Sequence, residues 1–298
     1  RIVYCSISGY GQQGPLAERG AYDHVIQALT GMMMMSGDSE ESPPIKVGFP
    51  VIDVAVGMLG ALSITAALHK MDENNPGKRA GGYIDASMLQ ASLMLMYPHA
   101  CNYLSRDIEP KRVGNRGYTG SPTADTYQCL DGWLSVAANT PEQFRKLTRV
   151  LGMESVCEDA QLLDLEKFNA PQGGFVVAKD LPTLRAKFQE AFSRKSAFEA
   201  ETELNLVGIP AARVRRIGEF LHEGTNKGAI STTAYEHAAG NVLTPGLGFQ
   251  LQGMNRSGNP APELGSDTRA LLESIGMNAN DIEQLQSAGV ITVAQALV

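Results

Sequence analysis

Apolar and polar positions divide the first third of the chain into strand-like and helix-like segments. Residues 2–8 form a β-rich run that stops at the glycine-rich loop 9–15. From Ile52 to Lys70 the apolar and small residues recur at helical spacing, which predicts a buried helix. Residues 83–85 are predicted to form a short strand, and residues 88–103 a second buried helix. Strands that alternate with helices in this way are typical of an α/β domain.

The pattern changes in the middle of the chain. Residues 106–122 are basic and contain several glycines, which is typical of a linker or an active-site loop. Short strand-like pieces then alternate with amphipathic helices. One of these helices is predicted to begin after Thr140, with Pro141 in its first turn and Gln143 as the partner of the cap.

Four other segments have a weaker periodicity of apolar residues. A helix is expected over residues 20–35, where it ends in four consecutive methionines, and another over residues 181–192. Residues 225–265 are rich in glycine and proline and are expected to be irregular. Residues 266–298 are expected to form one or two short acidic helices.

These segments predict a three-part organisation. Residues 1–115 would form the first part of a large α/β domain, and residues 116–224 a small α+β domain with its linkers. Residues 225–298 would return to complete the large domain. The irregular stretches between the parts are long enough to wrap around a partner chain.

Composition narrows the classes of function. The net charge is -7, with 43% apolar and 19% charged residues among 298. An acidic balance argues against a general affinity for nucleic acid or for an anionic membrane, but it leaves room for a local basic pocket. The most apolar run, residues 54–68, is shorter than the roughly 20 residues that cross a bilayer, so no membrane span is expected.

The reactive side chains do not form a pattern that suggests a metal. The four cysteines are far apart without a CxxC pair, and the five histidines show no HExxH spacing. We therefore expect no metal, no disulfide and a reducing, cytoplasmic location. The chain begins at Arg1 inside a predicted strand, so we expect an N-terminal portion of the natural protein to be missing.

Two local motifs have competing interpretations. Gly9-x-Gly11-x-x-Gly14 matches the dinucleotide-binding fingerprint in form, but Pro15 and the turn-like residues after it do not open a helix. Glycines that form a tight turn at the end of a sheet explain it better. Asp53 is a lone carboxylate at the head of an apolar helix, where both a capping role and a catalytic role are open.

Several stretches, in this order and spacing, resemble the family III CoA-transferases, which include formyl-CoA and carnitine CoA-transferases. The resemblance covers essentially the whole chain. The stretches that carry it are Ser6-Ile-Ser-Gly-Tyr-Gly-Gln-Gln-Gly-Pro15, Arg19-Gly-Ala-Tyr-Asp23, Pro50-Val-Ile-Asp53, Gly82-Tyr-Ile-Asp-Ala-Ser87, Gly114-Asn-Arg-Gly117, Asp131-Gly-Trp133, Ile209-Pro-Ala-Ala212 and Pro262-Glu-Leu-Gly265.

The resemblance implies a fold and a site. The fold would be α/β, with a large Rossmann-like domain that is incomplete at its N-terminus, an inserted small α+β domain, and an interlocked homodimer. Asp53 would be the catalytic nucleophile and would carry an aspartyl-CoA intermediate, with nearby backbone N–H groups holding the oxyanion. Coenzyme A or an acyl-CoA would be a substrate. The residues that would contact it are Arg19, Gly20, Ala21 and Tyr22, and those of a covering loop are Gly117, Tyr118, Thr119 and Gly120.

Two other functions fit the same resemblance. A 2-methylacyl-CoA racemase shares the aspartate but needs a second acid/base, a histidine in that family, where this chain has Tyr22. His24 lies two residues further on and is expected to face elsewhere. A truncated CoA-binding protein without catalysis is the third possibility, because CoA contacts of relatives lie in the N-terminal portion that this chain lacks. The family's Gly-x-His-Thr is here Gly265-Ser-Asp-Thr268.

Overall fold

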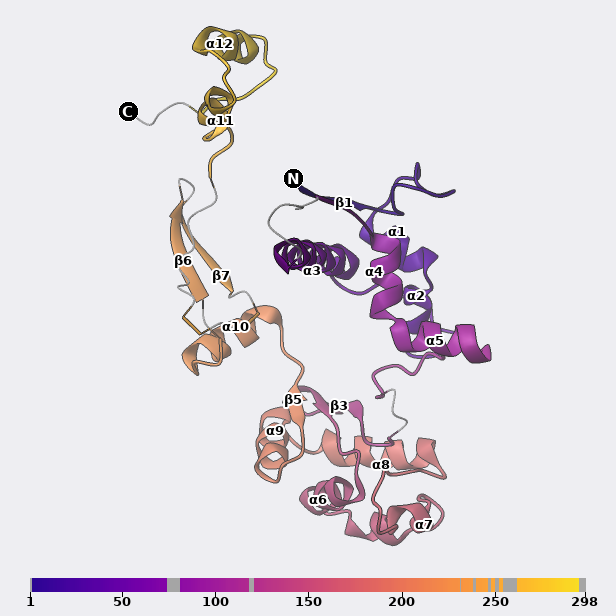
Figure 1. Cartoon of the computed structure of the whole chain (residues 1–298). Coiled ribbons are helices and arrows are strands. Elements are labelled where there is room, and N and C mark those ends of the chain that lie inside the picture. The colour runs from indigo at the N-terminus through magenta and orange to yellow at the C-terminus, as the bar shows by residue number, and fades with distance from the viewer. Residues whose placement is uncertain are drawn as a thin grey trace. The chain divides into compact units, whose positions relative to one another are not determined.

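A computed structural model describes residues 2–73, 81–117, 121–230, 232–237, 240–245, 248–249, 252–253 and 262–294 (Figure 1). The chain forms two compact units, Arg1–Val214 and Arg215–Val298. The elements are mixed α and β with small sheets, as the predicted α/β class requires. The division into residues 1–115, 116–224 and 225–298 stays a prediction.

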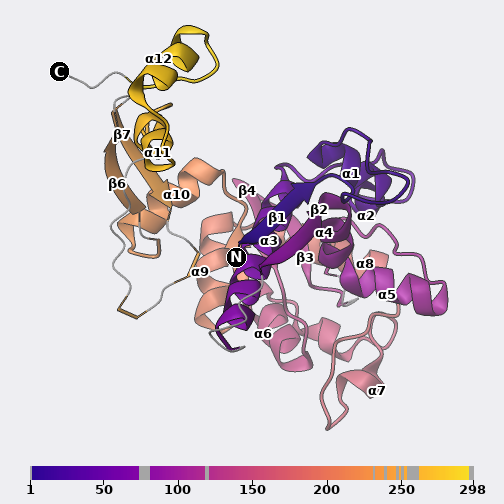
Figure 2. The same cartoon turned by 45° about the horizontal axis from the view of Figure 1, so that its top comes forward.

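The candidate site lies in the part of the first unit that is built on a parallel strand pair. The strands β1 (Val3–Ser8) and β2 (Gly82–Ser87) pair in register from Val3 with Gly82 to Ser8 with Ser87 (Figure 2). Parallel strands need a long crossover, and three helices lie between them in the chain. These helices are α1 (Asp23–Leu29), α2 (Met32–Met35) and α3 (Val51–Glu73). The predicted strands and the position of the long predicted helix are confirmed. The prediction that this helix is buried is wrong, because 17% of its most apolar stretch is buried.

Two predicted helices are broken. The single helix expected over residues 20–35 is α1 and α2, separated by Gly31, whose φ of 82° lies in the left-handed region where a helix cannot continue. The helix expected over residues 88–103 is α4 (Met88–Leu95) followed by α5 (Tyr97–Arg106). A proline occupies the first turn of α5, where its missing N–H costs nothing. Because α5 has no buried residue, the prediction of one buried helix is wrong for its second half.

A compact apolar core joins these elements. Its buried members are Tyr10, Ile26, Met32, Ile52, Val56, Met88, Ala91 and Met96. The loop after β1 packs closely on the segment before α1, because a Cβ atom on Gly9 would lie only 2.3 Å from the Cβ of Ala21. Glycine is required at position 9 by this approach. The carbonyl of Gly9 also accepts a hydrogen bond of 3.0 Å from the amide of Leu89, which ties the loop to α4.

Helix α3 leaves much of its apolar surface uncovered. Val54, Met58 and Leu62 are each more than half exposed. The stretch Val51–Lys70 is 20 residues long with a mean hydropathy of 2.0, and 17% of its most apolar window is buried. It is therefore long and apolar enough to cross a membrane. The expectation that the apolar segment is too short, based on residues 54–68, is wrong because the helix begins at Val51. Core helices of soluble proteins can have the same length and hydropathy.

A second core in the first unit surrounds an antiparallel sheet. Its strand order is β3 (Asp125–Cys129), β4 (Gly132–Val136) and β5 (Ala211–Arg213). The helices around it are α6 (Pro141–Leu151), the 3-10 helix η1 (Glu154–Glu158), α7 (Leu165–Phe168), α8 (Leu181–Ser193) and α9 (Ala197–Leu206). The capping box predicted for Thr140 and Gln143 is present at the start of α6.

Aromatic rings fill this second core. Phe188 lies between Tyr127 and Phe144, with ring-centroid distances of 6.3 and 5.6 Å. Asp131 accepts hydrogen bonds from the amide of Ala197 at 2.6 Å and from the hydroxyl of Ser196 at 2.8 Å, so it fastens the β3–β4 turn to the start of α9. This contact gives the Asp131-Gly-Trp133 motif a structural explanation.

The second unit contains a hairpin and short helices. Its elements are α10 (Ile217–Asn226), β6 (Thr232–His237), β7 (Gly240–Pro245), α11 (Thr268–Ser274) and α12 (Ala279–Ser287). The two strands pair antiparallel, from Thr232 with Pro245 to His237 with Gly240. The irregular segment expected over residues 225–265 is therefore wrong at the hairpin, where β-branched residues favour strands despite the glycines nearby. Two short helices near the C-terminus are confirmed, and α12 is acidic as expected, whereas α11 carries one arginine and one glutamate.

Candidate active site

Asp53 lies in the first turn of α3 and is exposed to solvent. Its carboxylate makes no hydrogen bond or ion pair with the residues that the structure describes. The residue before the helix is Pro50, whose carbonyl accepts the amide hydrogen of Val54 at 3.2 Å. The carboxylate therefore stands at the N-terminal end of a long helix with free access to a ligand.

The cap of α3 is a different carboxylate. Asp23, the first residue of α1, accepts the amide hydrogen of Ile52 at 2.7 Å and that of Asp53 at 3.3 Å, both at Oδ2. Asp23 is only 9% exposed. An anion at the N-terminus of a helix satisfies amides that have no partner within the helix and interacts favourably with the helix dipole. The capping role that the sequence left open for Asp53 is thus performed by Asp23.

A buried glutamine supports this cap. Gln27, which has no exposed surface, donates a hydrogen bond from Nε2 to Oδ1 of Asp23. Its Oε1 accepts the amide hydrogen of Val47 at 2.9 Å. The two side chains therefore connect α1, the segment before α3 and the first turn of α3 in one buried network.

The first-turn amides of α3 have no capacity left for an oxyanion. Val51 donates its amide hydrogen to the carbonyl of Phe49 at 2.8 Å, and Val54 donates to Pro50. The amides of Ile52 and Asp53 are bound by Asp23. These amides are therefore not available to a developing oxyanion, because protein groups already satisfy them. The expectation that nearby backbone N–H groups hold the oxyanion stays a prediction.

The segment predicted to contact CoA leads directly into the cap. Arg19 and Gly20 are exposed, Ala21 packs on the loop after β1, and Tyr22 is 74% exposed. The next residue, Asp23, binds the amide of Asp53, which lies 30 residues later in the chain. The segment that precedes Asp23 therefore lies close to the candidate nucleophile.

The ring of Tyr22 stacks on that of His24, with centroids 6.2 Å apart and planes 13° from parallel. The expectation that His24 faces elsewhere is therefore wrong. Tyr22 precedes α1 in an extended conformation, so helical spacing does not separate the two rings. An imidazole is thus present beside the position where the sequence showed only a phenol.

The predicted covering loop is described only at its first residue. Gly117 donates its amide hydrogen to the carbonyl of Ala124 at 2.7 Å. Tyr118, Thr119 and Gly120 lie outside the described residues. The structure therefore does not place this loop relative to Asp53.

One basic residue of the segment 106–122 has a structural role. Arg112 is 4% exposed, and its guanidinium donates to the carbonyls of Met34 at 2.9 Å, Ser39 at 3.4 Å and Ser42. Its own amide donates to the carboxylate of Glu40. The loop after α2 is wound around this side chain, so Arg112 is not available to a phosphorylated ligand.

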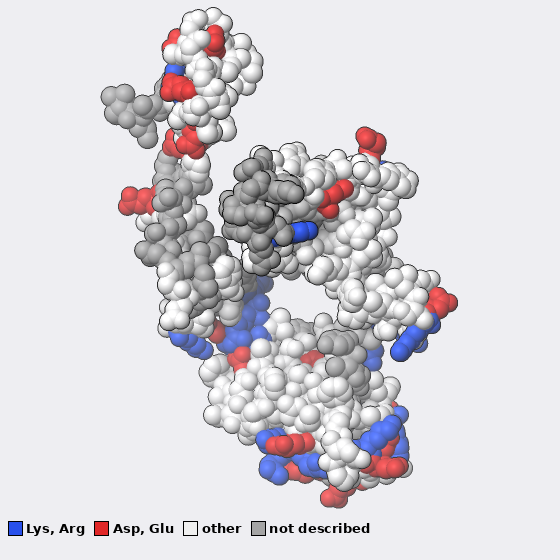
Figure 3. All heavy atoms as spheres, viewed as in Figure 1, with Lys and Arg blue, Asp and Glu red and all other residues white. Residues whose placement is uncertain are grey.

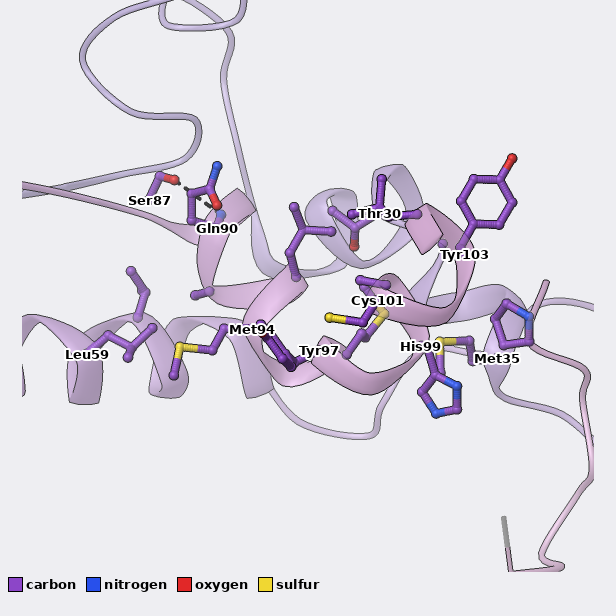
Figure 4. A pocket seen from close by; sticks show the side chains of 18 of the residues that line it. Thr30, Met35, Leu59, Ser87, Gln90, Met94, Tyr97, His99, Cys101 and Tyr103 are labelled. Carbon is purple, nitrogen blue, oxygen red and sulfur yellow. Dashed lines mark hydrogen bonds between the residues drawn. The ribbon is translucent and has the colours of Figure 1, made fainter. Parts of the chain in front are cut away.

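Sequence reasoning missed an apolar cavity of about 740 Å³ between α3, α4 and α5 (Figure 4). Its labelled lining residues include Leu59 from α3, Met94 from α4 and Tyr97 from α5. Asp53 is not among the lining residues. The apolar residues of α4 and α5 that line this cavity could have indicated it. The sequence pattern instead predicts that they lie in one buried helix.

Charge around the site is sparse. On the face shown in Figure 3, Lys, Arg, Asp and Glu gather over α6 and α7, and few cover the region of α1 to α5. Among the residues that the structure describes, no group of three His, Cys, Asp or Glu side chains could hold a metal ion. The carboxylate of Asp53 is accessible to solvent, and the carboxyl group of Asp23 binds the amide of the same residue.

Comparisons with known proteins agree on one family. Residues 1–268 match the family described as CoA-transferase family III. A succinyl-CoA:glutarate CoA-transferase from Mus musculus is 28% identical over 97% of this chain. An acetyl-CoA:oxalate CoA-transferase from Acetobacter aceti is 26% identical over 91% of the chain.

A solved structure shares the fold. A CAIB/BAIF family protein from Brucella suis superimposes with a TM-score of 0.72 over 92% of this chain and 68% of its own, at 24% identity. The chain spans 64% of the length of the mouse relative and 66% of the Acetobacter one.

Proposed function

The chain belongs to CoA-transferase family III, and we propose that it moves CoA from an acyl-CoA to a free carboxylic acid with Asp53 as the nucleophile. The observation that carries this proposal is the exposed carboxylate of Asp53, which has no side-chain partner in the described part of the chain while its backbone is held by a buried network. A carboxylate that is accessible yet fixed at its backbone suits attack on a bound thioester.

The reaction proceeds in four exchanges. A carboxylate oxygen of Asp53 attacks the thioester carbonyl, the carbon–sulfur bond breaks, and CoA leaves as a thiolate from a mixed anhydride. The thiolate attacks the aspartyl carbonyl and releases the donor acid, which leaves an aspartyl-CoA thioester. The acceptor carboxylate then attacks that thioester and releases the thiolate again. Finally the thiolate attacks the acceptor carbonyl and regenerates the Asp53 carboxylate.

Carboxylate chemistry fits this sequence of exchanges energetically. An anhydride is at least as reactive toward nucleophiles as a thioester, so no intermediate is a deep trap. The oxyanions that form on the way need donors other than the amides of residues 51–54, since these are occupied.

We assign CoA contact to the segment Arg19–Tyr22. Its exposure and its direct continuation into Asp23 support this assignment. Arg19 offers a charge to a phosphate, and the exposed ring of Tyr22 offers a face to the pantetheine arm. We also propose that two copies of the chain form a homodimer, for which the uncovered apolar surface of α3 provides the area.

Trapping with hydroxylamine tests the nucleophile. The chain is incubated with succinyl-CoA and glutarate, or acetyl-CoA and oxalate, the pairs that the relatives' names suggest. Hydroxylamine converts an activated carboxylate into a hydroxamate, which peptide mass spectrometry locates. We expect a hydroxamate at Asp53 that depends on one acyl-CoA.

Two variants make the trapping specific. In Asp53→Asn the hydroxamate and the turnover should both disappear. Asp38→Asn changes another exposed carboxylate without a side-chain partner in the described chain, and it should behave as wild type. An Asp53 that stays unmodified with every acyl-CoA would contradict catalysis by this chain and favour a CoA-binding protein without activity.

A further inference from the structure

Two buried polar side chains lie directly beneath the candidate nucleophile. Asp23 and Gln27 are both buried, and both belong to α1 rather than to the helix that carries Asp53. We propose that Asp23 is a positioning residue for Asp53, held in turn by Gln27. This inference rests on the proposed function, because it concerns the same carboxylate.

The contacts define what is positioned. Oδ2 of Asp23 lies 2.7 Å from the amide nitrogen of Ile52 and 3.3 Å from that of Asp53. The second of these nitrogens is bonded to the Cα atom from which the reacting side chain extends. Fixing it removes backbone freedom at the nucleophile and leaves only the side-chain rotamers to place the attacking oxygen.

The network also fixes the orientation of the glutamine. Oε1 of Gln27 accepts from the amide of Val47, which can only donate. Its Nε2 must therefore point to Oδ1 of Asp23, which can accept when the carboxyl is ionised. Asp23 thus accepts three N–H groups from two directions, and neither of its oxygens can be replaced by a donor without a clash.

This arrangement separates two tasks that one carboxylate could not perform together. Hydrogen bonds to a carboxylate lower its nucleophilicity, and the amides at a helix N-terminus would bind any nearby anion. Asp23 takes those amides. The Asp53 carboxylate is therefore left without strong donors and remains free to attack.

The variant Asp23→Asn tests the proposal with a side chain of nearly equal shape. One oxygen becomes an NH2 group, which must face either the amides of residues 52–53 or the NH2 of Gln27. We expect kcat to fall about 100-fold, the scale of a misplaced reacting group, and KM for the acyl-CoA to change little. A loss of fold alone would also lower the apparent kcat without changing KM, so kcat is calculated per folded protein, with the folded fraction measured for each variant.

A swapped pair provides the rescue. In Asp23→Asn with Gln27→Glu, the new NH2 group donates to the new carboxylate, whose other oxygen still accepts from Val47. The asparagine oxygen then accepts from the amides of residues 52–53. We expect this double variant to recover most of the lost kcat, and Gln27→Glu alone to be as impaired as Asp23→Asn.

Ile26→Val is the matched control for stability. Ile26 is fully buried in the same helix, and its side chain takes no part in the network. Hydrogen exchange of peptide 50–56 should be faster in Asp23→Asn than in Ile26→Val at equal unfolding temperature. Unchanged exchange, or faster exchange with unchanged kcat, would overturn the proposal.

The two proposals fail in different ways. A wild-type chain without turnover and without a hydroxamate at Asp53 would end the proposed function. Exchange at residues 52–53 would still decide whether Asp23 holds the first turn of α3. Normal wild-type turnover together with full activity of Asp23→Asn would instead remove the positioning role and leave Asp53 as the nucleophile.

Discussion

At the scale of single residues, the sequence located Asp53 but not its surroundings. Local sequence left capping and catalysis open, and only the family resemblance favoured catalysis. The cap is Asp23, which lies 30 residues earlier than Asp53 and approaches it only after α1 packs on α3. Such a contact is tertiary, so no local pattern indicates it. Arg112 is a second example. The sequence places it in the basic segment 106–122, but in the structure its buried side chain holds the loop after α2 through tertiary contacts.

The stacked rings of Tyr22 and His24 make proton chemistry at this site testable. Racemisation of a 2-methylacyl-CoA exchanges the α-proton with solvent, so turnover in D2O would introduce deuterium at that carbon. We expect no α-deuterium, because a single aspartate does not complete a two-base site. Mass spectrometry of the recovered acyl-CoA checks this.

The control is His24→Ala, which removes the imidazole that stacks on Tyr22. CoA transfer should continue in this variant at a rate close to wild type. Deuterium incorporation in the wild type that is lost in His24→Ala would contradict the transferase proposal and favour the racemase.

At the scale of elements, strands and helices with a strong period were predictable. The pair β1 and β2, the long helix α3 and the capping box of α6 all follow from local residue choice. Breaks within helical patterns were not, because Gly31 and the proline of α5 were outweighed by the apolar residues around them. The hairpin β6–β7 was missed because glycine and proline content was given more weight than β-branched residues.

The fastening of α9 by Asp131 predicts a pH dependence of stability. The amide of Ala197, and then the hydroxyl of Ser196, lower the pKa of the Asp131 carboxyl below its usual value. A lowered pKa means stabilisation that is complete above the unfolded value of about 4 and is lost as the pH falls through the folded value. Asp131→Asn should therefore be less stable than wild type at neutral pH, and the difference should shrink in acid.

Urea unfolding followed by the fluorescence of Trp133, the single tryptophan, measures this difference at several pH values. Glu154→Gln, which changes an exposed carboxylate around the same core, is the control and should show no such convergence. A gap between wild type and Asp131→Asn that stays constant below pH 4 would show that the carboxylate's charge is not what fastens α9.

At the scale of the whole molecule, the first unit has two apolar cores that share no buried residue. One surrounds β1, β2 and α3, and the other surrounds the antiparallel sheet β3–β4–β5. The sequence indicated this separation through its change of pattern after residue 105. The prediction that residues 225–298 complete the large domain depends on contacts between distant parts of the chain, and it stays a prediction.

Two cores predict two local stabilities. Phe188→Ala removes a fully buried ring from the second core, and truncations of this kind cost about 3–5 kcal/mol. Hydrogen exchange should become faster over residues 125–136 and stay unchanged over residues 88–95. Ile26→Val should have the reverse effect, since it thins the first core.

Equal acceleration of exchange in both regions by Phe188→Ala would contradict this expectation. The two cores would then unfold as one cooperative unit.

The contact between Gly9 and Ala21 bears on how this chain can drift during evolution. A methyl group gained at position 9 would collide with the existing one at position 21, since the two carbons would be only 2.3 Å apart. The reverse order is open, because loss of the methyl at position 21 first would make room for alanine at position 9. Descendants of this sequence can therefore exchange the two residues, but only along a path whose first step is taken at position 21.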